Sequence, residues 1–150
     1  TLLDITENNL SKIIKKLKNK DIVGVNVTLP YKQKIVPHLD VLVNDAEATN
    51  SVNTLYLDKK GIVVGENTDV YGLQAAYLKE IDNSSKKRAL VIGAGGVAPS
   101  VILSLIKCGV QKVSIVNRTI EKCIFLKKRF NNLNESFNYW RKWLFRNSLS

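Results

Sequence analysis

The chain has 150 residues, of which 45% are hydrophobic and 24% are charged. This composition supports a buried core, in one domain or in adjoining parts of two, and it excludes a disordered chain. No apolar run reaches the roughly 18 residues of a membrane span, and no charged-then-apolar leader opens the chain. We therefore expect a cytoplasmic protein without a membrane partner.

The net charge of +10 raises the question of a nucleic-acid partner, and its distribution argues against one. Residues 101–150 carry ten basic and two acidic side chains, so nearly all of the excess lies in the last third of the chain. A phosphate-binding cofactor site would use part of this charge. The rest surrounds the aromatic residues of 137–145, where no nucleic-acid-binding motif occurs, so we expect no nucleic-acid partner.

Residues that commonly bind metals are few and scattered. Cys108 and Cys123 have no CxxC or Cys/His partner, so we expect two buried thiols and neither a zinc site nor a disulfide. His38, the only histidine, follows a proline in a predicted loop, and we expect it at the surface rather than in catalysis.

Hydrophobic periodicity divides the first half of the chain into helices and strands. Apolar residues at the i, i+3, i+4 and i+7 spacing predict an amphipathic helix over 10–17, with Thr6 as a candidate cap. Pro30 is placed to open a helix that Pro37 ends. The other predicted elements are a strand over 22–28, a short helix over 45–49, a hairpin of strands 52–57 and 62–64, and a helix from 67–69 to about residue 81.

The second half alternates more regularly, and it begins after the polar segment 82–87, which we interpret as a domain boundary. The predicted elements are a buried strand over 88–92, a helix over 96–108, a strand over 113–116 and a helix over 121–130. Alternating strands and helices form a parallel sheet with right-handed crossovers. The sequence therefore predicts an α/β protein with domains at 1–82 and 83–150. The segment after residue 131 has no clear periodicity, and we make no secondary-structure prediction for it.

A glycine-rich motif of the form G-x-G-x-x-A lies between the strand over 88–92 and the helix that follows. Its first glycine permits a tight turn, its second allows the backbone to approach a pyrophosphate, and its alanine allows close packing of helix on strand. The free N–H groups of the helix N-terminus attract the anion. The motif therefore predicts a dinucleotide site, and its residues are Gly93, Ala94, Gly95, Gly96, Val97 and Ala98.

The next predicted strand ends in Asn117, Arg118 and Thr119, and Lys122 follows. An NAD site would place Asp or Glu here to hold the ribose 2′-hydroxyl. A guanidinium instead pairs with a 2′-phosphate and stacks on adenine. These residues therefore predict NADP as the cofactor.

A second set of polar residues lies near the ends of elements in the first half, where α/β proteins bind ligands. Two of them are two positions apart and share one face of a predicted strand. A lysine and a carboxylate each open a predicted helix. The set comprises Asn26, Thr28, Lys32, Asn53 and Asp69.

Five segments of the chain together resemble the shikimate dehydrogenase family, in the same order and near the same spacings. They are NVTLPYK at 26–32, SVNTLY at 51–56, GENTDVYG at 65–72, GAGGVA at 93–98 and NRT at 117–119. The resemblance extends over about 4–130. It implies an α/β substrate domain followed by the first half of a Rossmann-type dinucleotide-binding domain.

The resemblance also implies roles for the residues singled out above. Lys32 is then the catalytic lysine and Asp69 its carboxylate partner, while Asn26, Thr28 and Asn53 contact the substrate. The glycine motif binds the pyrophosphate of NADP. The remaining implied cofactor residues, which hold the adenosine 2′-phosphate, are Asn117, Arg118, Thr119 and Lys122.

The implied reaction is the reversible NADP-dependent reduction of 3-dehydroshikimate to shikimate, in the biosynthesis of chorismate and aromatic amino acids. A quinate/shikimate dehydrogenase and a non-catalytic anion-binding remnant of the family are the alternatives. The family's opening strand, with two serines, and its later strands, with a substrate-contacting glutamine, have no counterpart here. We therefore interpret the chain as a fragment, unmatched after residue 134, that turns over slowly or not at all by itself.

Overall fold

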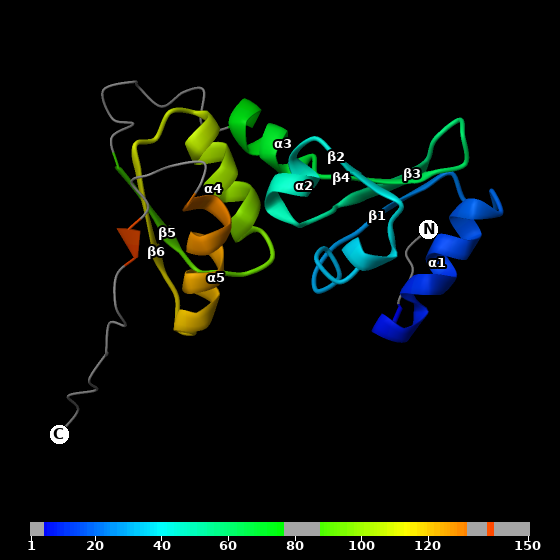
Figure 1. The fold of residues 1–150 in the computed structure, drawn as a ribbon, viewed down its shortest axis with the longest axis horizontal. Helices are drawn as coiled ribbons and strands as arrows, with labels where there is room; N and C mark the ends of the chain where they lie inside the picture. Colours follow the sequence, from blue (N-terminus) through cyan, green and yellow to red (C-terminus); the bar gives the residue numbers. More distant parts are fainter. Residues whose placement is uncertain (1–4, 77–87, 132–137, 140–150) are drawn as a thin grey trace.

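Figure 1 shows the computed structural model of the chain, which describes residues 5–76, 88–131 and 138–139. The described residues form two sheets, one in each half of the chain. The elements in chain order are η1 (Glu7–Asn9), α1 (Leu10–Lys18), β1 (Gly24–Asn26), η2 (Val36–His38), β2 (Val41–Val43), α2 (Asp45–Thr49), β3 (Thr54–Leu57), β4 (Val63–Glu66), α3 (Asp69–Ala76), β5 (Arg88–Ile92), α4 (Ala98–Lys107), β6 (Lys112–Val116), α5 (Ile120–Phe130) and β7 (Asn138–Tyr139), where η marks a 3₁₀ helix.

The first sheet has the strand order β1-β3-β4-β2, and only its β2–β4 pair is parallel. The predicted hairpin is confirmed as β3 and β4. The apolar face of α1 is buried and packs on this sheet, which confirms the amphipathic helix. The buried residues of the resulting core are Leu10, Ile14, Leu17, Ile35, Ala46, Val52, Leu55 and Val63.

One prediction for the first half is wrong, and one predicted strand is shorter than expected. Residues 30–35 form turns rather than a helix, followed by η2, because the carbonyl of Lys32 accepts the N–H of Val52 at 2.8 Å instead of continuing a helical ladder. The strand expected over 22–28 is shorter, since only β1 pairs with β3. The short helix over 45–49 is confirmed as α2. The helix expected to reach about residue 81 begins as α3, and residues 77–81 lie outside the described part.

The second sheet has the order β5-β6-β7, and both of its pairs are parallel, which confirms the predicted parallel sheet. The helices α4 and α5 bury apolar residues against it, among them Ile102, Leu126 and Phe130. The strand β5 is not buried as expected. Leu90 and Ile92 are 59% and 82% exposed, because α4 and α5 cover only the other face among the described residues.

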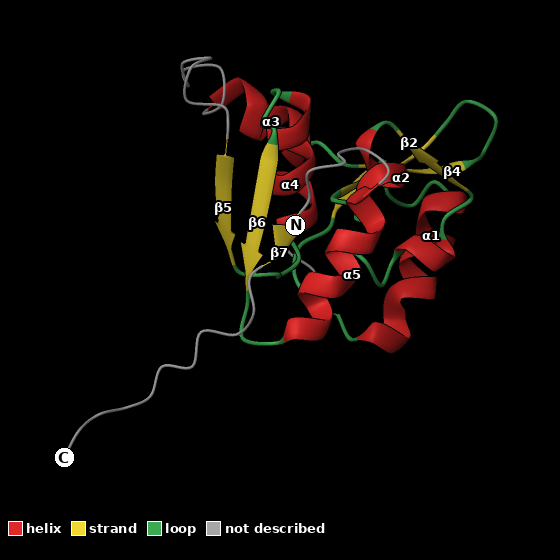
Figure 2. Cartoon of the chain, turned by 60° about the vertical axis from the view of Figure 1, so that its left-hand side comes forward, coloured by secondary structure: helices red, strands yellow, loops and turns green. Residues whose placement is uncertain are grey.

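The two halves meet through short helices, with α2 and α3 lying between the sheets and α3 packed beside α4 (Figures 1 and 2). The hydroxyl of Ser104 in α4 donates to the carbonyl of Val70 in α3 at 3.1 Å. At the last residue of α4, one turn further on, Lys107 Nζ lies 2.5 Å from Asp45 Oδ1, at the start of α2. No helix among the described residues is long and apolar enough to cross a membrane.

Of the cysteines and the histidine, Cys108 lies at this junction, where Gln74 Nε2 of α3 is 3.7 Å from its Sγ. Both cysteines are free, and Cys123 is buried as expected, whereas Cys108 is only partly buried. His38 is exposed at the end of η2, which confirms its predicted surface position.

Candidate functional site

A lysine, a carboxylate and an amide from three distant parts of the chain meet in one hydrogen-bonded cluster. Lys32 Nζ donates to Asp69 Oδ2 at 2.6 Å, and Asn53 Nδ2 donates to Asp69 Oδ1 at 2.8 Å. Lys32 is buried, with 8% of the residue exposed, while the side chain of Asp69 is 24% exposed. The pair is therefore shielded at the lysine and open to solvent at the carboxylate.

Main-chain hydrogen bonds hold the loop that carries Lys32. Its carbonyl accepts the N–H of Val52, next to Asn53, and the hydroxyl of Tyr31 donates to the carbonyl of Ile5 at 2.6 Å. These contacts tie the loop to the start of β3 on one side and to the N-terminal segment on the other. These contacts, and not a helix, therefore place the ammonium group of Lys32 next to Asp69.

The amide of Asn53 is fixed on both of its atoms. Its Oδ1 accepts the N–H of Thr68 at 3.0 Å, while its Nδ2 reaches Asp69 and Thr68 Oγ1. Thr54 Oγ1 donates to Asn53 Oδ1 at 3.0 Å and lies 3.4 Å from Asn26 Oδ1. A chain of polar groups therefore runs from the Lys32–Asp69 pair to β1.

The two remaining expected substrate residues are both exposed. Asn26 ends β1 and is exposed, within reach of Thr54. Thr28 is also exposed, and its carbonyl accepts the N–H of Tyr31 at 2.9 Å. The structure thus brings Lys32, Asn53 and Asp69 into contact and links Asn26 to them through Thr54, whereas no side-chain hydrogen bond joins Thr28 to this cluster among the described residues.

The glycine-rich turn between β5 and α4 is pinned to the end of β6. Gly93 has φ of +108°, a backbone conformation that favours glycine, and its N–H donates to the carbonyl of Val116 at 2.7 Å. The N–H of Ala94 donates to Asn117 Oδ1 at 3.1 Å, and Asn117 Nδ2 donates to the carbonyl of Thr119 at 2.9 Å. One amide therefore fixes the two loops in which the sequence predicts cofactor binding.

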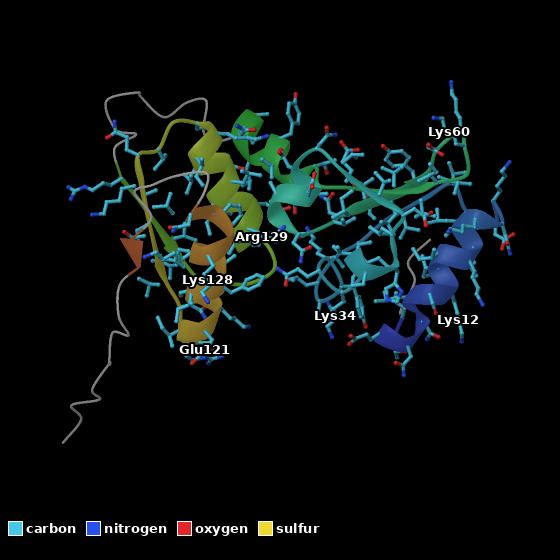
Figure 3. All side chains as sticks on the ribbon, in the orientation of Figure 1. Lys12, Lys34, Lys60, Glu121, Lys128 and Arg129 are labelled. Atoms are coloured by element: carbon cyan, nitrogen blue, oxygen red, sulfur yellow. The ribbon has the colours of Figure 1, made fainter. Side chains whose placement is uncertain are left out.

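A cavity of about 310 Å³ borders this turn. Residues of α5 and of the turn line it, and so does Gln33, which follows Lys32 in the first half of the chain. The lining residues are Gln33, Ala94, Gly95, Gly96, Glu121, Lys122, Phe125 and Leu126. Arg118 and Thr119 are exposed nearby, between β6 and α5. Figure 3 marks Glu121 at the start of α5.

Sequence reasoning missed two residues of this region. Leu29 packs against Gly96 so closely that a Cβ on that glycine would collide with Leu29 Cδ2. Gln33 lines the cavity from the side of the lysine loop. Both flank the segment from Pro30 to Lys32, so their nearness to Lys32 was the available signal, but only the packing of the two halves brings them to the glycine turn.

The glycine turn has the features that a dinucleotide site requires. A Cβ on Gly95 would meet no heavy atom within 4 Å, so the backbone there is open to a ligand. The turn leads into the N-terminus of α4, whose first N–H groups favour an anion, and the adjoining cavity is lined by one lysine and one glutamate. Fold and site together define an α/β protein with a dinucleotide-binding turn of the Rossmann type.

Comparison with known proteins identifies the family within this class. A model of the "Shikimate dehydrogenase substrate binding domain" matches residues 1–55, and one of "Shikimate / quinate 5-dehydrogenase" matches residues 75–142. The chain therefore belongs to the shikimate dehydrogenase family.

Individual relatives agree with this assignment. The chain is 40% identical over 129 residues to a shikimate dehydrogenase (NADP(+)) of Pelagibacter ubique, a match that covers 86% of this chain and 48% of the relative. A crystal structure of a shikimate dehydrogenase in complex with NADP+ superposes with a TM-score of 0.78 at 33% identity, covering 91% of this chain and 49% of that one.

A third similar protein is a quinate dehydrogenase from Corynebacterium glutamicum in complex with NAD. It has a TM-score of 0.78 at 29% identity, and the match covers 87% of this chain and 47% of that one. The chain thus spans about half the length of the relatives it matches.

Proposed function

We propose that the protein carrying this chain is an NADP-dependent shikimate dehydrogenase, which interconverts 3-dehydroshikimate and shikimate. One observation carries the proposal: the loop with Lys32 lies directly on the glycine turn. Leu29, before Lys32, contacts Gly96, and Gln33, after it, lines the cavity beside that turn. A proton-donating cluster and a dinucleotide turn side by side are what a ketone reductase needs.

In this proposal Lys32 and Asp69 are the catalytic pair. Lys32 Nζ donates a hydrogen bond to the substrate's carbonyl oxygen and stabilises the negative charge that develops there. Asp69 orients the ammonium through the 2.6 Å contact and accepts hydrogen bonds from ring hydroxyls. The burial of Lys32 keeps water away and strengthens the interaction.

The substrate and cofactor residues divide between the two halves, with residues 1–82 as substrate domain and 83–150 as cofactor domain. Asn26, Thr28 and Asn53 contact the substrate at the open side of the pair. When bound, the reduced cofactor NADPH would supply the hydride for reduction of the ketone, and NADP+ would accept it in the reverse direction. The residues that would hold its pyrophosphate are Gly93, Ala94, Gly95, Gly96, Val97 and Ala98, and those that would hold its adenosine 2′-phosphate are Arg118, Thr119 and Lys122.

Asn117 has a different part in this proposal from the one its position in the sequence suggested. Both ends of its side chain are engaged within the protein, by the N–H of Ala94 and the carbonyl of Thr119. We therefore assign it to holding the pyrophosphate turn and the 2′-phosphate loop together. It would act on the cofactor chiefly through those loops.

The test is NADP-linked oxidation of shikimate by the full-length protein, with quinate and NAD as the competing substrate and cofactor. We expect turnover with shikimate and NADP to exceed turnover with the other pairs. Preference for quinate with NAD would favour the quinate dehydrogenase, an alternative supported by the similarity to the Corynebacterium glutamicum enzyme. Absence of turnover with every combination of substrate and cofactor would favour the remaining alternative, a non-catalytic anion-binding remnant of the family.

Substitution of Lys32 tests whether that activity depends on the Lys32–Asp69 pair. Lys32→Ala should lower kcat by a factor on the order of 10² to 10⁴, with little change in KM. Lys34→Ala is the matched control, because Lys34 lies two residues away, is exposed and pairs with Glu7 at the surface (Figure 3). Equal activity in both variants would remove Lys32 from the mechanism.

A further inference from the structure

A buried amide outside the catalytic pair lies where the two halves of the chain meet. Asn67 precedes α3 and is only 3% exposed. Its Nδ2 lies 2.9 Å from Thr49 Oγ1, 3.0 Å from the carbonyl of Ser51 and 3.0 Å from Ser100 Oγ. Thr49 ends α2 and Ser100 lies in the first turn of α4, so this side chain joins three segments.

The other atom of the same amide acts on the catalytic segment. Asn67 Oδ1 accepts the N–H of Asp69 at 3.0 Å. Asp69 opens α3, where the N–H groups of a helix have no partner within the helix, so this bond caps the helix and fixes its first residue. The direction in which the Asp69 carboxylate points toward Lys32 therefore depends on Asn67.

The contact with Ser100 extends this effect to the cofactor side. Ser100 is fully buried and lies two residues after Ala98, which ends the glycine motif. Its hydroxyl is within 3.4 Å of Asn67 Oδ1 as well as 3.0 Å of Asn67 Nδ2, so it can donate to or accept from the amide. A displacement of the first turn of α4 is thus transmitted to Asp69 through one side chain.

We propose that Asn67 is a positioning residue that, with Ser100, sets the place of the Lys32–Asp69 pair relative to the glycine turn. This inference rests on the proposed function, because the position of the pair relative to the glycine turn matters only if hydride is transferred between a substrate at the pair and a cofactor at the turn. Substrate and cofactor still bind when the link is cut, but the reacting atoms are held less accurately. Such a loss acts on kcat rather than on KM.

The chain offers a matched control on the same helix. Ser104 follows Ser100 by one turn and is equally buried, and it also reaches α3, through the carbonyl of Val70. Its hydroxyl bonds to the carbonyls of Val70 and Ser100 and to neither Asn67 nor Asp69. Ser100→Ala and Ser104→Ala thus remove the same group from the same helix, and only the first removes a bond to the amide.

The experiment compares these two variants in the full-length protein by kinetics and by amide hydrogen exchange. For Ser100→Ala we expect kcat to fall about tenfold with both KM values within about twofold, and the Asp69 amide to exchange about tenfold faster. For Ser104→Ala we expect kcat and the Asp69 exchange rate to stay near the wild-type values. Asn67→Ala should exceed Ser100→Ala in both effects if it folds.

The two readouts separate this inference from the proposed function. Equal exchange of the Asp69 amide in both serine variants would overturn the positioning role whatever the activity. A wild-type protein without shikimate turnover would refute the proposed function and with it the kinetic part of the inference. Faster exchange with an unchanged kcat would also overturn it, because the link would then be structural only.

Discussion

The side chain of Leu29 lies on the backbone of Gly96, so that a Cβ on this glycine would collide with Leu29 Cδ2. Leu29 belongs to the loop that delivers Lys32, and Gly96 to the turn before α4. The contact brings the proposed catalytic lysine and the proposed dinucleotide turn together although they are far apart in the sequence. It leaves no room for a side chain at position 96.

Replacing Gly96 by Ala should destabilise the protein, and shortening Leu29 should restore it. The colliding atom is the end of a flexible side chain that is 58% exposed, so we expect a cost of about 1 kcal/mol, at the low end for overpacking. The double variant Gly96→Ala with Leu29→Ala should recover most of this loss. Urea denaturation of the wild type, the two single variants and the double variant measures these changes in stability.

Gly95→Ala is the control for that cycle, because a Cβ there meets nothing within 4 Å. Its stability should stay near the wild-type value, while NADP affinity falls, since the new methyl group stands where the backbone must approach the pyrophosphate. If Gly95→Ala destabilised the protein as much as Gly96→Ala, the Leu29 contact would not be the cause.

The elements that the sequence predicts well are those with local causes. The apolar spacing of α1, the short helix α2 and the alternation of strand and helix from β5 to α5 all depend on neighbouring residues. The helix expected after Pro30 is absent because the carbonyl of Lys32 pairs with Val52, a partner from another segment. The strand β2 went unnoticed for the same reason, since its three residues pair with β4.

The candidate site divides in the same way. Motifs placed Lys32, Asn53 and Asp69 on the list of functional residues, and the structure brings them into contact. The local pattern indicated Asn67 only as a cap of the helix that follows and did not indicate Ser100, because the bond between them depends on the packing of α3 against α4. A buried hydrogen bond between helices from different halves has no signature in a single sequence.

A second prediction concerns the buried hydroxyl of Ser51. Its Oγ has no hydrogen-bond partner among the described residues, although the residue is fully buried. Burying an unsatisfied polar group costs about 1–3 kcal/mol, so Ser51→Ala should raise the free energy of unfolding by about 1 kcal/mol. The carbonyl of Ser51, which accepts from Asn67, remains.

The measurement is the midpoint of urea denaturation, with Ser104→Ala as the comparison. Ser104 Oγ lies within hydrogen-bond distance of the carbonyls of Ser100 and Val70, at 2.7 and 3.1 Å, so its removal should lower the midpoint. A Ser51→Ala variant as unstable as Ser104→Ala would show that the Ser51 hydroxyl makes a stabilising contact.

A third prediction concerns Arg129, near the end of α5, which reaches across to α2. Its Nε donates to the carbonyl of Ala48 at 2.8 Å and its Nη2 to the carbonyl of Glu47 at 2.5 Å (Figure 3). Burial lowers the pKa of this guanidinium, because it disfavours the charged form. The two hydrogen bonds compensate for the lost hydration. Arg129→Ala should therefore cost about 1–3 kcal/mol of stability.

Lys128→Ala is the matched control, because this neighbouring residue is exposed. Arg129→Lys should recover only part of the loss, since an ammonium lacks the two-pronged geometry. Thermal unfolding of the three variants measures the effect. A Tm for Arg129→Ala equal to that of Lys128→Ala would mean that this contact does not stabilise the junction of the two halves.

The last prediction concerns the pH dependence of stability at Asp40, beside the first sheet. The N–H of Val63, and to a smaller extent the ammonium of Lys18, lowers the pKa of Asp40 below its ordinary value of 3.8. A carboxyl whose pKa is lower in the folded state stabilises the protein above its unfolded pKa, and this contribution is lost as the pH falls through the folded pKa. Asp40→Asn should therefore lower Tm at neutral pH, and the difference from wild type should shrink below pH 3.8 and vanish once the carboxyl is protonated.

Lys18→Ala should give a smaller difference, because the Val63 N–H has the larger effect on the pKa of Asp40. Thermal unfolding across this pH range checks both variants, and a difference that stays constant down to the lowest pH would show that Asp40 acts through its shape rather than its charge.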